Sequence, residues 1–308
     1  MTNSCSAVQN FNAFAPIARI GLGSAQFGRR YGATNRHPPP SMRDVAMILE
    51  RAAAAGVSWI DTAPDYGDAE ALLGGMLASA PSFRLVTKIP SLETAPIGAA
   101  GDTLYAAAVQ SLERLRQTSV DVLLLHRAAD LSRPDWADIV AALQSLRAHG
   151  LTRRIGAAVY DPRELDLVIT RLSPDVVQLP LNPLDRRFST TEQCRRLCEL
   201  GIAVHARSLF LQGLLVAAPD DLPDFARSRP EIAAWRRWLG TRDLPPLTAC
   251  LSYAMMVPQV EVAFVGIAAL GELEEILRVA AELPADLDIS NLPNGEPDLI
   301  DPRKWPKP

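Results

Sequence analysis

Short apolar runs and longer amphipathic stretches alternate along most of the chain. The runs are rich in Val, Ile, Leu and Ala and have the length of β-strands buried on both faces of a parallel sheet. Such strands are expected at residues 17–27, 57–61, 83–88, 120–126, 154–159, 176–179, 202–207 and 262–266. The pattern therefore predicts eight strands, each followed by a helical segment.

Between these runs apolar residues recur at helical spacing, and capping residues mark several helix ends. Ser41 precedes one stretch as an N-cap, with Asp44 three residues further on, and Gly56 is its stop signal. Pro162 occupies the first turn of another, directly after Asp161. Helices are expected at residues 41–55, 102–115, 136–149, 191–200, 231–239, 247–256 and 271–283, with two more beginning near 68 and 161.

Eight strand–helix units in a chain of 308 residues predict an α/β fold. A closed (β/α)₈ TIM barrel fits this length better than an open, doubly wound sheet. No linker interrupts the pattern, so we expect residues 1–308 to form a single domain with its core at about 17–283. Residues 284–308 are rich in Pro and Asp and are expected to form an extended C-terminal arm.

Composition and charge exclude several classes of partner. The net charge is −4 and no basic face or long run of one sign occurs, so neither nucleic acid nor an anionic membrane is an expected partner. No apolar stretch approaches the roughly 20 residues that span a bilayer, and the first residues lack the features of a secretory signal. We expect a cytoplasmic protein. Cys194 and Cys198 have no further Cys or His at ligand spacing, so no metal site is expected.

Polar side chains that could perform chemistry follow three of the expected strands. Asp61 ends the second strand, and Tyr66 comes five residues later in a loop broken by Pro64. Lys88 ends the third strand and His126 the fourth. In TIM barrels the active site gathers at the carboxyl ends of the strands. These four side chains are therefore expected to meet in one site.

Their combined chemistry would suit proton transfer to a carbonyl oxygen. An ammonium beside a phenol stabilises the phenolate and lowers the pKa of the phenol, so Lys88 is expected to make Tyr66 a better acid. Asp61 would keep Lys88 charged, and His126 would hold the substrate oxygen in place. Singly, each residue has a plainer interpretation: Asp61 as a loop cap, Tyr66 and Lys88 as surface groups, His126 as a core histidine. Their joint placement favours a shared site.

These residues lie within longer motifs that carry a family resemblance. The motifs are Gly-Leu-Gly-Ser-Ala-Gln-Phe-Gly (21–28), Asp-Thr-Ala-Pro-Asp-Tyr-Gly (61–67), Thr-Lys (87–88), Leu-Leu-Leu-His-Arg (123–127) and Gln-Gly-Leu-Leu (212–215). In this order they resemble the aldo-keto reductase family, over about residues 17–283. The Ala-Gln-Phe-Gly motif resembles a bacterial branch that is often linked to sugar pathways.

The resemblance implies an NAD(P)H-dependent reductase with a (β/α)₈ barrel. Tyr66 would be the proton donor, assisted by Asp61, Lys88 and His126. The nicotinamide dinucleotide would lie along the ends of the later strands, where Asn182 also matches a residue of the family's pocket. The expected cofactor-binding residues are Gln178, Arg207, Ser208, Leu209, Gln212, Gly266, Ala268 and Glu275.

Three departures from the family pattern concern the cofactor. Ala158 and Val159 stand where the family usually has a Ser-Asn pair that binds the carboxamide, and Arg207 stands where an aromatic ring commonly stacks. Residues 265–275 contain no cation to clamp a 2′-phosphate but three carboxylates, Glu272, Glu274 and Glu275. A phosphate would meet only backbone amides near 268–272. The family implies NADP(H), and the missing clamp leaves NAD(H) as an alternative.

The leading hypothesis is reduction of an aldehyde or ketone, with keto-sugars and sugar derivatives among the candidates. Two alternatives keep the fold: a nucleotide-binding sensor, and a redox-neutral elimination or epimerisation that uses Tyr66 and Lys88. The expected partners are a small carbonyl compound and a nicotinamide dinucleotide, for a monomer or small homo-oligomer. Arg29 and Arg30, after the first strand, would attract an anionic substrate such as a phosphorylated or nucleotide-linked sugar, or belong to a solvated loop.

Overall fold

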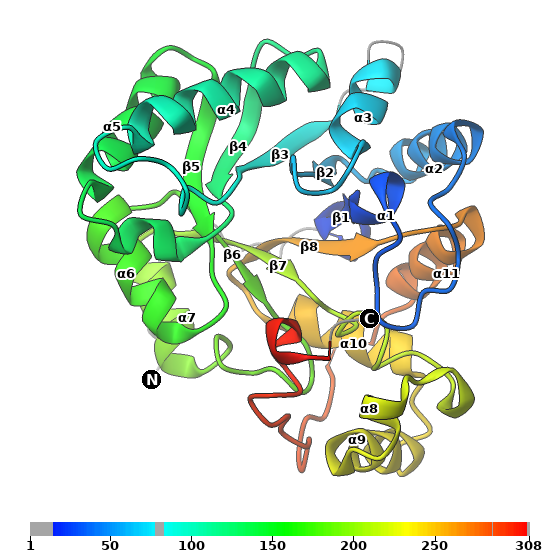
Figure 1. Ribbon diagram of the computed structural model, residues 1–308. Helices are drawn as coiled ribbons and strands as arrows, with labels where there is room; N and C mark the ends of the chain where they lie inside the picture. The colour runs from blue at the N-terminus through cyan, green and yellow to red at the C-terminus, as the bar shows by residue number, and fades with distance from the viewer. Residues whose placement is uncertain (1–14, 78–82, 285, 307–308) are drawn as a thin grey trace.

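Eight parallel strands close into a barrel in the computed structural model, which describes residues 15–77, 83–284 and 286–306. Each strand pairs with its successor, and β8 pairs with β1 (Figure 1). The strands are β1 (Ile20–Gly23), β2 (Trp59–Asp61), β3 (Arg84–Ile89), β4 (Val120–Leu125), β5 (Thr152–Ala158), β6 (Val176–Pro180), β7 (Ala203–Arg207) and β8 (Val260–Gly266). The predicted TIM barrel is confirmed.

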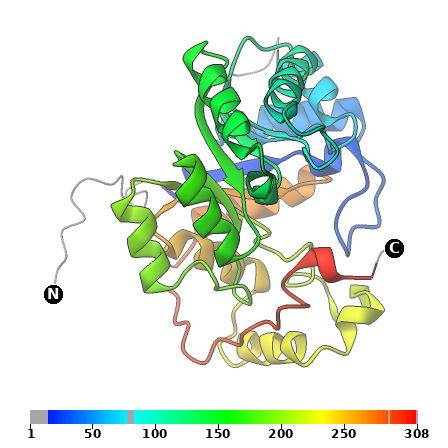
Figure 2. The same ribbon diagram turned by 60° about the vertical axis from the view of Figure 1, so that its left-hand side comes forward.

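Helices form a ring outside the strands (Figure 1). They are α1 (Ala25–Gly28), α2 (Met42–Ala54), α3 (Ala69–Leu77), α4 (Ala100–Leu115), α5 (Trp136–Ala148), α6 (Pro162–Leu172), α7 (Thr191–Glu199), α8 (Asp224–Arg227), α9 (Pro230–Gly240), α10 (Pro246–Met256) and α11 (Leu270–Ala281). In both views α8 and α9 project beside the ring (Figures 1 and 2). Among the described residues, no helix combines the length and apolarity needed to traverse a bilayer.

Local signals explain the clearest helix starts. Ser41 accepts a hydrogen bond from the backbone N–H of Asp44, whose carboxylate accepts one from the backbone N–H of Ser41, so α2 begins with the capping box that the sequence predicts. The first strand is shorter than expected. Pro16 opens a 3₁₀ helix through Arg19, whose guanidinium donates to the carbonyl of Val260, and β1 begins only after it.

The amino end of the barrel is closed by side chains inside the ring. His205 lies edge-on to Trp59 and Phe264, with ring centroids 5.2 and 5.4 Å apart. A register shift between β7 and β8 lets Glu261 pair with His205 at 3.2 Å and with Arg154 at 2.8 Å. Because this end is filled, the carboxyl ends of the strands are left for a binding site.

The C-terminal arm folds back against the ring. The backbone N–H of Gly295 donates to Leu184, and Leu299 is buried. A final 3₁₀ helix, Pro302–Lys304, is red in Figures 1 and 2. It brings Arg303 close to the end of β5, where the guanidinium lies against the ring of Tyr160. The arm therefore contributes to the barrel mouth. That the whole chain forms one domain stays a prediction.

Candidate active site

The four residues singled out from the sequence meet at the carboxyl ends of β2, β3 and β4. Asp61 is the last residue of β2, Lys88 lies in β3, and His126 directly follows β4. Tyr66 lies in the loop after β2, held against α1 by two glycines: a Cβ on Gly28 would lie 1.9 Å from the Tyr66 carbonyl oxygen, and Gly67 has φ +62°. This close backbone packing fixes the loop that carries the phenol.

Lys88 is the centre of the hydrogen-bond network. Its Nζ donates to both carboxylate oxygens of Asp61 at 2.7 Å, to the carbonyl oxygen of Thr62 at 3.0 Å and to the hydroxyl of Tyr66 at 3.2 Å. Only 1% of the Lys88 residue is exposed. A buried ammonium needs such compensation, and the carboxylate supplies it.

The predicted acidification of Tyr66 is wrong for this arrangement. Burial raises the pKa of Tyr66 well above its usual value, and the negative charge of Asp61 raises it further. Arg207 acts in the opposite direction. The ammonium of Lys88 is already neutralised by Asp61, while burial lowers the pKa of Lys88 itself. The phenol therefore keeps its proton at neutral pH, as a proton donor must.

His126 has a partner that the sequence did not reveal. Its Nδ1 lies 3.0 Å from a carboxylate oxygen of Asp65, and its ring stands edge-on to Tyr66 with centroids 6.0 Å apart. Burial lowers the pKa of His126, and the contact with His126 lowers the pKa of Asp65. The imidazole is therefore neutral at pH 7, with Nδ1 beside the carboxylate. Asp65 directly precedes Tyr66, but a single carboxylate in a loop is too weak a signal to assign.

Gln178 connects the Lys88 network to the rest of the pocket. Its Nε2 donates to Asp61 at 2.7 Å. Its Oε1 is buried and, among the described residues, has no hydrogen-bond partner; the same holds for Oε1 of Gln26. Two buried acceptors without donors fit a ligand that carries amide or hydroxyl hydrogens.

A cavity of about 840 Å³ covers these groups and runs from the barrel mouth to α11. Asp61, Tyr66 and His126 line it, whereas Lys88 lies behind the wall and reaches it through Tyr66. All eight residues expected at the cofactor line the same cavity: Gln178, Arg207, Ser208, Leu209, Gln212, Gly266, Ala268 and Glu275.

Asn182 does not lie on the cavity wall, contrary to expectation. It is fully buried, its Nδ2 donates to the carbonyl of Ser208, and its Oδ1 accepts from the backbone N–H of Leu184 and Asp185. It therefore ties the loop after β6 to the loop after β7. Of the two apolar replacements, Ala158 lines the cavity and Val159 is buried.

The far end of the cavity lies at the start of α11. There the carboxylate of Glu272 accepts from the backbone N–H of Ala268 at 2.6 Å and of Ala269 at 3.2 Å. These amides belong to the group, near residues 268–272, that was expected from the sequence to be the only donors for a phosphate. Since Glu272 already occupies them with a negative charge, this end of the cavity disfavours a second anion.

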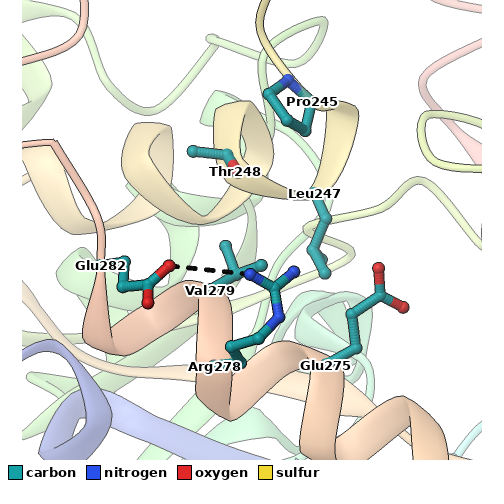
Figure 3. A pocket seen from close by; sticks show the side chains of 7 residues that line it. All are labelled: Pro245, Leu247, Thr248, Glu275, Arg278, Val279 and Glu282. Carbon is teal, nitrogen blue, oxygen red and sulfur yellow. Dashed lines mark ion pairs between the residues drawn. The ribbon is translucent and has the colours of Figure 1, made fainter.

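A smaller cavity of about 230 Å³ adjoins this end, between α10 and α11. It shares Pro245, Leu247 and Glu275 with the larger one. Figure 3 shows Arg278 directed to Glu282, at 3.6 Å, rather than to Glu275. Arg278, the cation on the wall of this smaller cavity, is therefore already paired.

A stack of three side chains forms one wall of the mouth. Tyr160, just after β5, has the guanidinium of Arg207 and that of Arg303 each 4.0 Å from its ring centroid. Arg207 also donates to Val159 and Ser208. Tyr160 and Arg303 were not predicted as site residues, because nothing in the C-terminal arm indicates which residue returns to the mouth. Within the described ranges, no cluster of three or more metal-binding side chains occurs.

Comparisons with known proteins agree with this geometry. The pattern of the Aldo/keto reductase family matches residues 19–290. An aldo-keto reductase of Mycobacterium sp. (strain KMS) is 30% identical over 243 residues, which cover 75% of this chain and 82% of the relative. A D-threo-aldose 1-dehydrogenase of Pseudomonas sp. is 27% identical, covering 88% of this chain and 92% of the relative.

The fold of a solved relative is also similar. The holo form of the aldo-keto reductase AKR11C1 from Bacillus halodurans superposes with a TM-score of 0.71 at 20% identity, covering 87% of this chain and 88% of that one. The family match spans most of the chain, and the resemblance predicted from the motifs is confirmed. The chain therefore belongs to the aldo/keto reductase family, and it is a nicotinamide-dependent oxidoreductase that acts on carbonyl compounds.

Proposed function

We propose that this enzyme uses Tyr66 to protonate the oxygen of an aldehyde or ketone, with NAD(H) as the preferred cofactor and a sugar or sugar derivative as substrate. The observation that carries the proposal is the hydrogen bond from Lys88 to the hydroxyl of Tyr66. The similarity to a D-threo-aldose 1-dehydrogenase supports a sugar substrate, as does a mouth lined by polar side chains such as Gln26, Thr34 and Asn35.

Tyr66 acts as a general acid whose strength depends on Lys88. The phenol is protonated before reaction, because burial and Asp61 raise its pKa. As its proton moves to the substrate oxygen, negative charge develops on the phenolic oxygen, 3.2 Å from the ammonium. The N–H that Lys88 donates is in place before this charge forms, so it stabilises the transition state more than the ground state.

His126 positions the carbonyl oxygen in this proposal. Nδ1 lies 3.0 Å from the carboxylate of Asp65, so Nε2 is the nitrogen left for a substrate oxygen or hydroxyl. The neutral ring lies edge-on to Tyr66 and adds no charge that would repel a proton from the phenol. Asp65 is therefore the carboxylate that would orient the ring when the substrate is bound.

The nicotinamide, when bound, supplies or accepts the hydride. The unpaired Oε1 atoms of Gln178 and Gln26 would accept from its carboxamide and ribose hydroxyls, and Ser208 and Gln212, on the same cavity wall, would hold its diphosphate. Ala158 and Val159 have no polar side-chain group, so Gln178 would supply most of the contacts with the carboxamide.

Turnover with a panel of carbonyl compounds tests the proposal. We expect the purified protein to oxidise NADH in the presence of aldoses and simple aldehydes, measured by loss of absorbance, with transfer of deuterium from labelled NADH to the product. Nucleotide binding without turnover on any carbonyl compound would instead favour the sensor. Product formation without nicotinamide would favour redox-neutral chemistry.

The preference for NAD(H) rests on Glu272. Its carboxylate occupies the amides of Ala268 and Ala269, so a 2′-phosphate there would meet a negative charge and no free donor. Replacing Glu272 with Ala frees both amides. We expect Glu272→Ala to tighten NADPH binding by about tenfold, the effect of gaining one hydrogen bond to a charged group. The affinity for NADH should change little. Titration of both cofactors by tryptophan fluorescence measures this.

Glu274→Ala is the matched control. Glu274 lies on the same helix but pairs with Arg51 at 2.7 Å and is absent from the cavity wall. Its replacement should leave both affinities unchanged. If the unmodified protein binds NADPH more tightly than NADH, the proposed preference is wrong.

A further inference from the structure

The mouth of the active-site cavity carries several guanidinium groups whose hydrogen-bond capacity differs. Arg303 is held by both oxygens of Asp301 and by Glu164. Arg207 donates to Val159 and Ser208. Arg36 lies 3.7 Å from Asp221. Each of these arginines already has a hydrogen-bond acceptor or an ion-pair partner within the protein.

Arg29 differs from them. Its guanidinium lines the cavity and, throughout the described segments, has neither a hydrogen-bond acceptor nor an ion-pair partner. The side chain is exposed and lies over two aromatic rings, 5.3 Å from the ring centroid of Tyr31 and 5.9 Å from that of Tyr66. The carboxylate of Asp65, whose pKa the charge of Arg29 helps to lower, lies 3.0 Å from Nδ1 of His126.

Cation–π contacts with two rings favour this position of the guanidinium without using its N–H groups. Cation–π contacts engage the face of an arginine, and its five N–H donors in the plane stay free. An oxyanion is the partner that matches such a fork, because a carboxylate or phosphate accepts two parallel hydrogen bonds. Arg207 adds a second positive charge on the same pocket, as its effect on the pKa of Tyr66 indicates.

We propose that Arg29 is a substrate-binding residue that selects a carbonyl compound bearing a carboxylate or phosphate. This rests on the proposed function, since it assigns the substrate class of the Tyr66 site. The oxyanion would bind Arg29 while the carbonyl oxygen lies at Tyr66, whose ring Arg29 covers. The chemistry shared by both anions is bidentate acceptance from the guanidinium, and matched substrates distinguish them.

Two matched pairs of substrates test the inference. For a carboxylate the pair is 4-formylbenzoate and its neutral methyl ester; for a phosphate it is D-glyceraldehyde 3-phosphate and D-glyceraldehyde. We expect kcat/KM to be about 10- to 100-fold higher for the anion in at least one pair, which is the effect expected of hydrogen bonds to one charged group. The preference should shrink at high salt, because Arg29 is exposed.

Variants assign the preference to Arg29. Arg29→Met, which keeps an unbranched apolar chain over the rings, should remove the preference by lowering kcat/KM for the anion far more than for the neutral partner, with little change in the affinity for NADH. Arg29→Lys should retain part of it. The control is Arg30→Met: this neighbour is exposed, donates to the Asn35 carbonyl and is not on the cavity wall, so its loss should change nothing.

Binding without turnover separates this inference from the proposed function. Calorimetric titration of each anion into the protein, with and without NADH, should show binding that Arg29→Met weakens. If no carbonyl compound is reduced but this binding persists, the proposed function fails and the anion site stands. Equal kcat/KM within both pairs, a preference that survives in Arg29→Met, or a loss of NADH affinity as the main effect of Arg29→Met each overturns the inference.

Discussion

Tyr66→Phe is expected to lower kcat for carbonyl reduction by about 10²- to 10⁴-fold, the range that a positioned general acid contributes. Phenylalanine keeps the ring beneath Arg29 and beside Lys88, whose Nζ lies 4.8 Å from the ring centroid, and removes only the hydroxyl that Lys88 contacts. NADH affinity should therefore change little. Steady-state kinetics together with cofactor titration measure both effects.

Tyr253→Phe is the control for the loss of a tyrosine hydroxyl. Tyr253 is buried, and its hydroxyl lies 2.6 Å from Ser189, away from the cavity wall. Its replacement should cost about 1 kcal/mol of stability and no activity. Undiminished turnover in Tyr66→Phe would remove Tyr66 from the mechanism.

The pH dependence offers a second view of Tyr66. Burial and Asp61 raise its pKa well above the usual value, so the phenol remains protonated through neutral and mildly alkaline pH. Reduction should not be lost through Tyr66 deprotonation below about pH 10, the ordinary pKa of tyrosine. A rate profile that falls between pH 7 and 9 with the signature of a phenol would contradict this assignment.

The barrel was predictable because its signals are local and repeated. Apolar runs such as 120–126 and caps such as Ser41 each specify one element, and parallel pairing then brings the strand ends together. From this pairing, Asp61, Lys88 and His126 were predicted to lie at one end of the barrel, as observed. The start of β1 was misjudged because apolar residues continue upstream of Ile20, while Pro16 opens a 3₁₀ helix there.

The rest of the site depends on contacts between distant segments. Arg303 reaches Tyr160 through an arm with no periodic pattern, and Glu272 turns back on the amides before its own helix. The pKa of Tyr66 was predicted in the wrong direction, because the spacing of residues does not show that Asp61 neutralises the charge of Lys88. Hydrogen-bond geometry and burial decide such cases, and neither can be read from residue types.

Asp61→Asn is expected to lower the free energy of unfolding by about 3–5 kcal/mol at pH 7, as well as activity. Lys88 has 1% of its surface exposed, and both carboxylate oxygens that neutralise it lie 2.7 Å away. Asparagine has nearly the same shape but no charge, so a buried ammonium loses its counter-ion. Chemical denaturation monitored by tryptophan fluorescence measures the loss.

The sign of the pH dependence follows from Lys88. Burial lowers its pKa in the folded protein, and without Asp61, which opposes this, the folded-state pKa falls further. Between that pKa and the unfolded value of about 10.4, the unfolded chain binds more protons, so stability rises with pH. The deficit of Asp61→Asn should therefore be largest at neutral pH and shrink as pH approaches 10.

Two comparisons separate charge burial from simple loss of an ion pair. Glu274→Gln breaks the Arg51–Glu274 pair, which has the same 2.7 Å distance but is exposed to solvent, and should cost less than about 1 kcal/mol. Asp61→Asn combined with Lys88→Met removes both buried charges and should regain most of the stability while activity stays low, because Tyr66 has lost its ammonium. If the double variant is as unstable as the single one, the loss arises from packing rather than from an uncompensated charge.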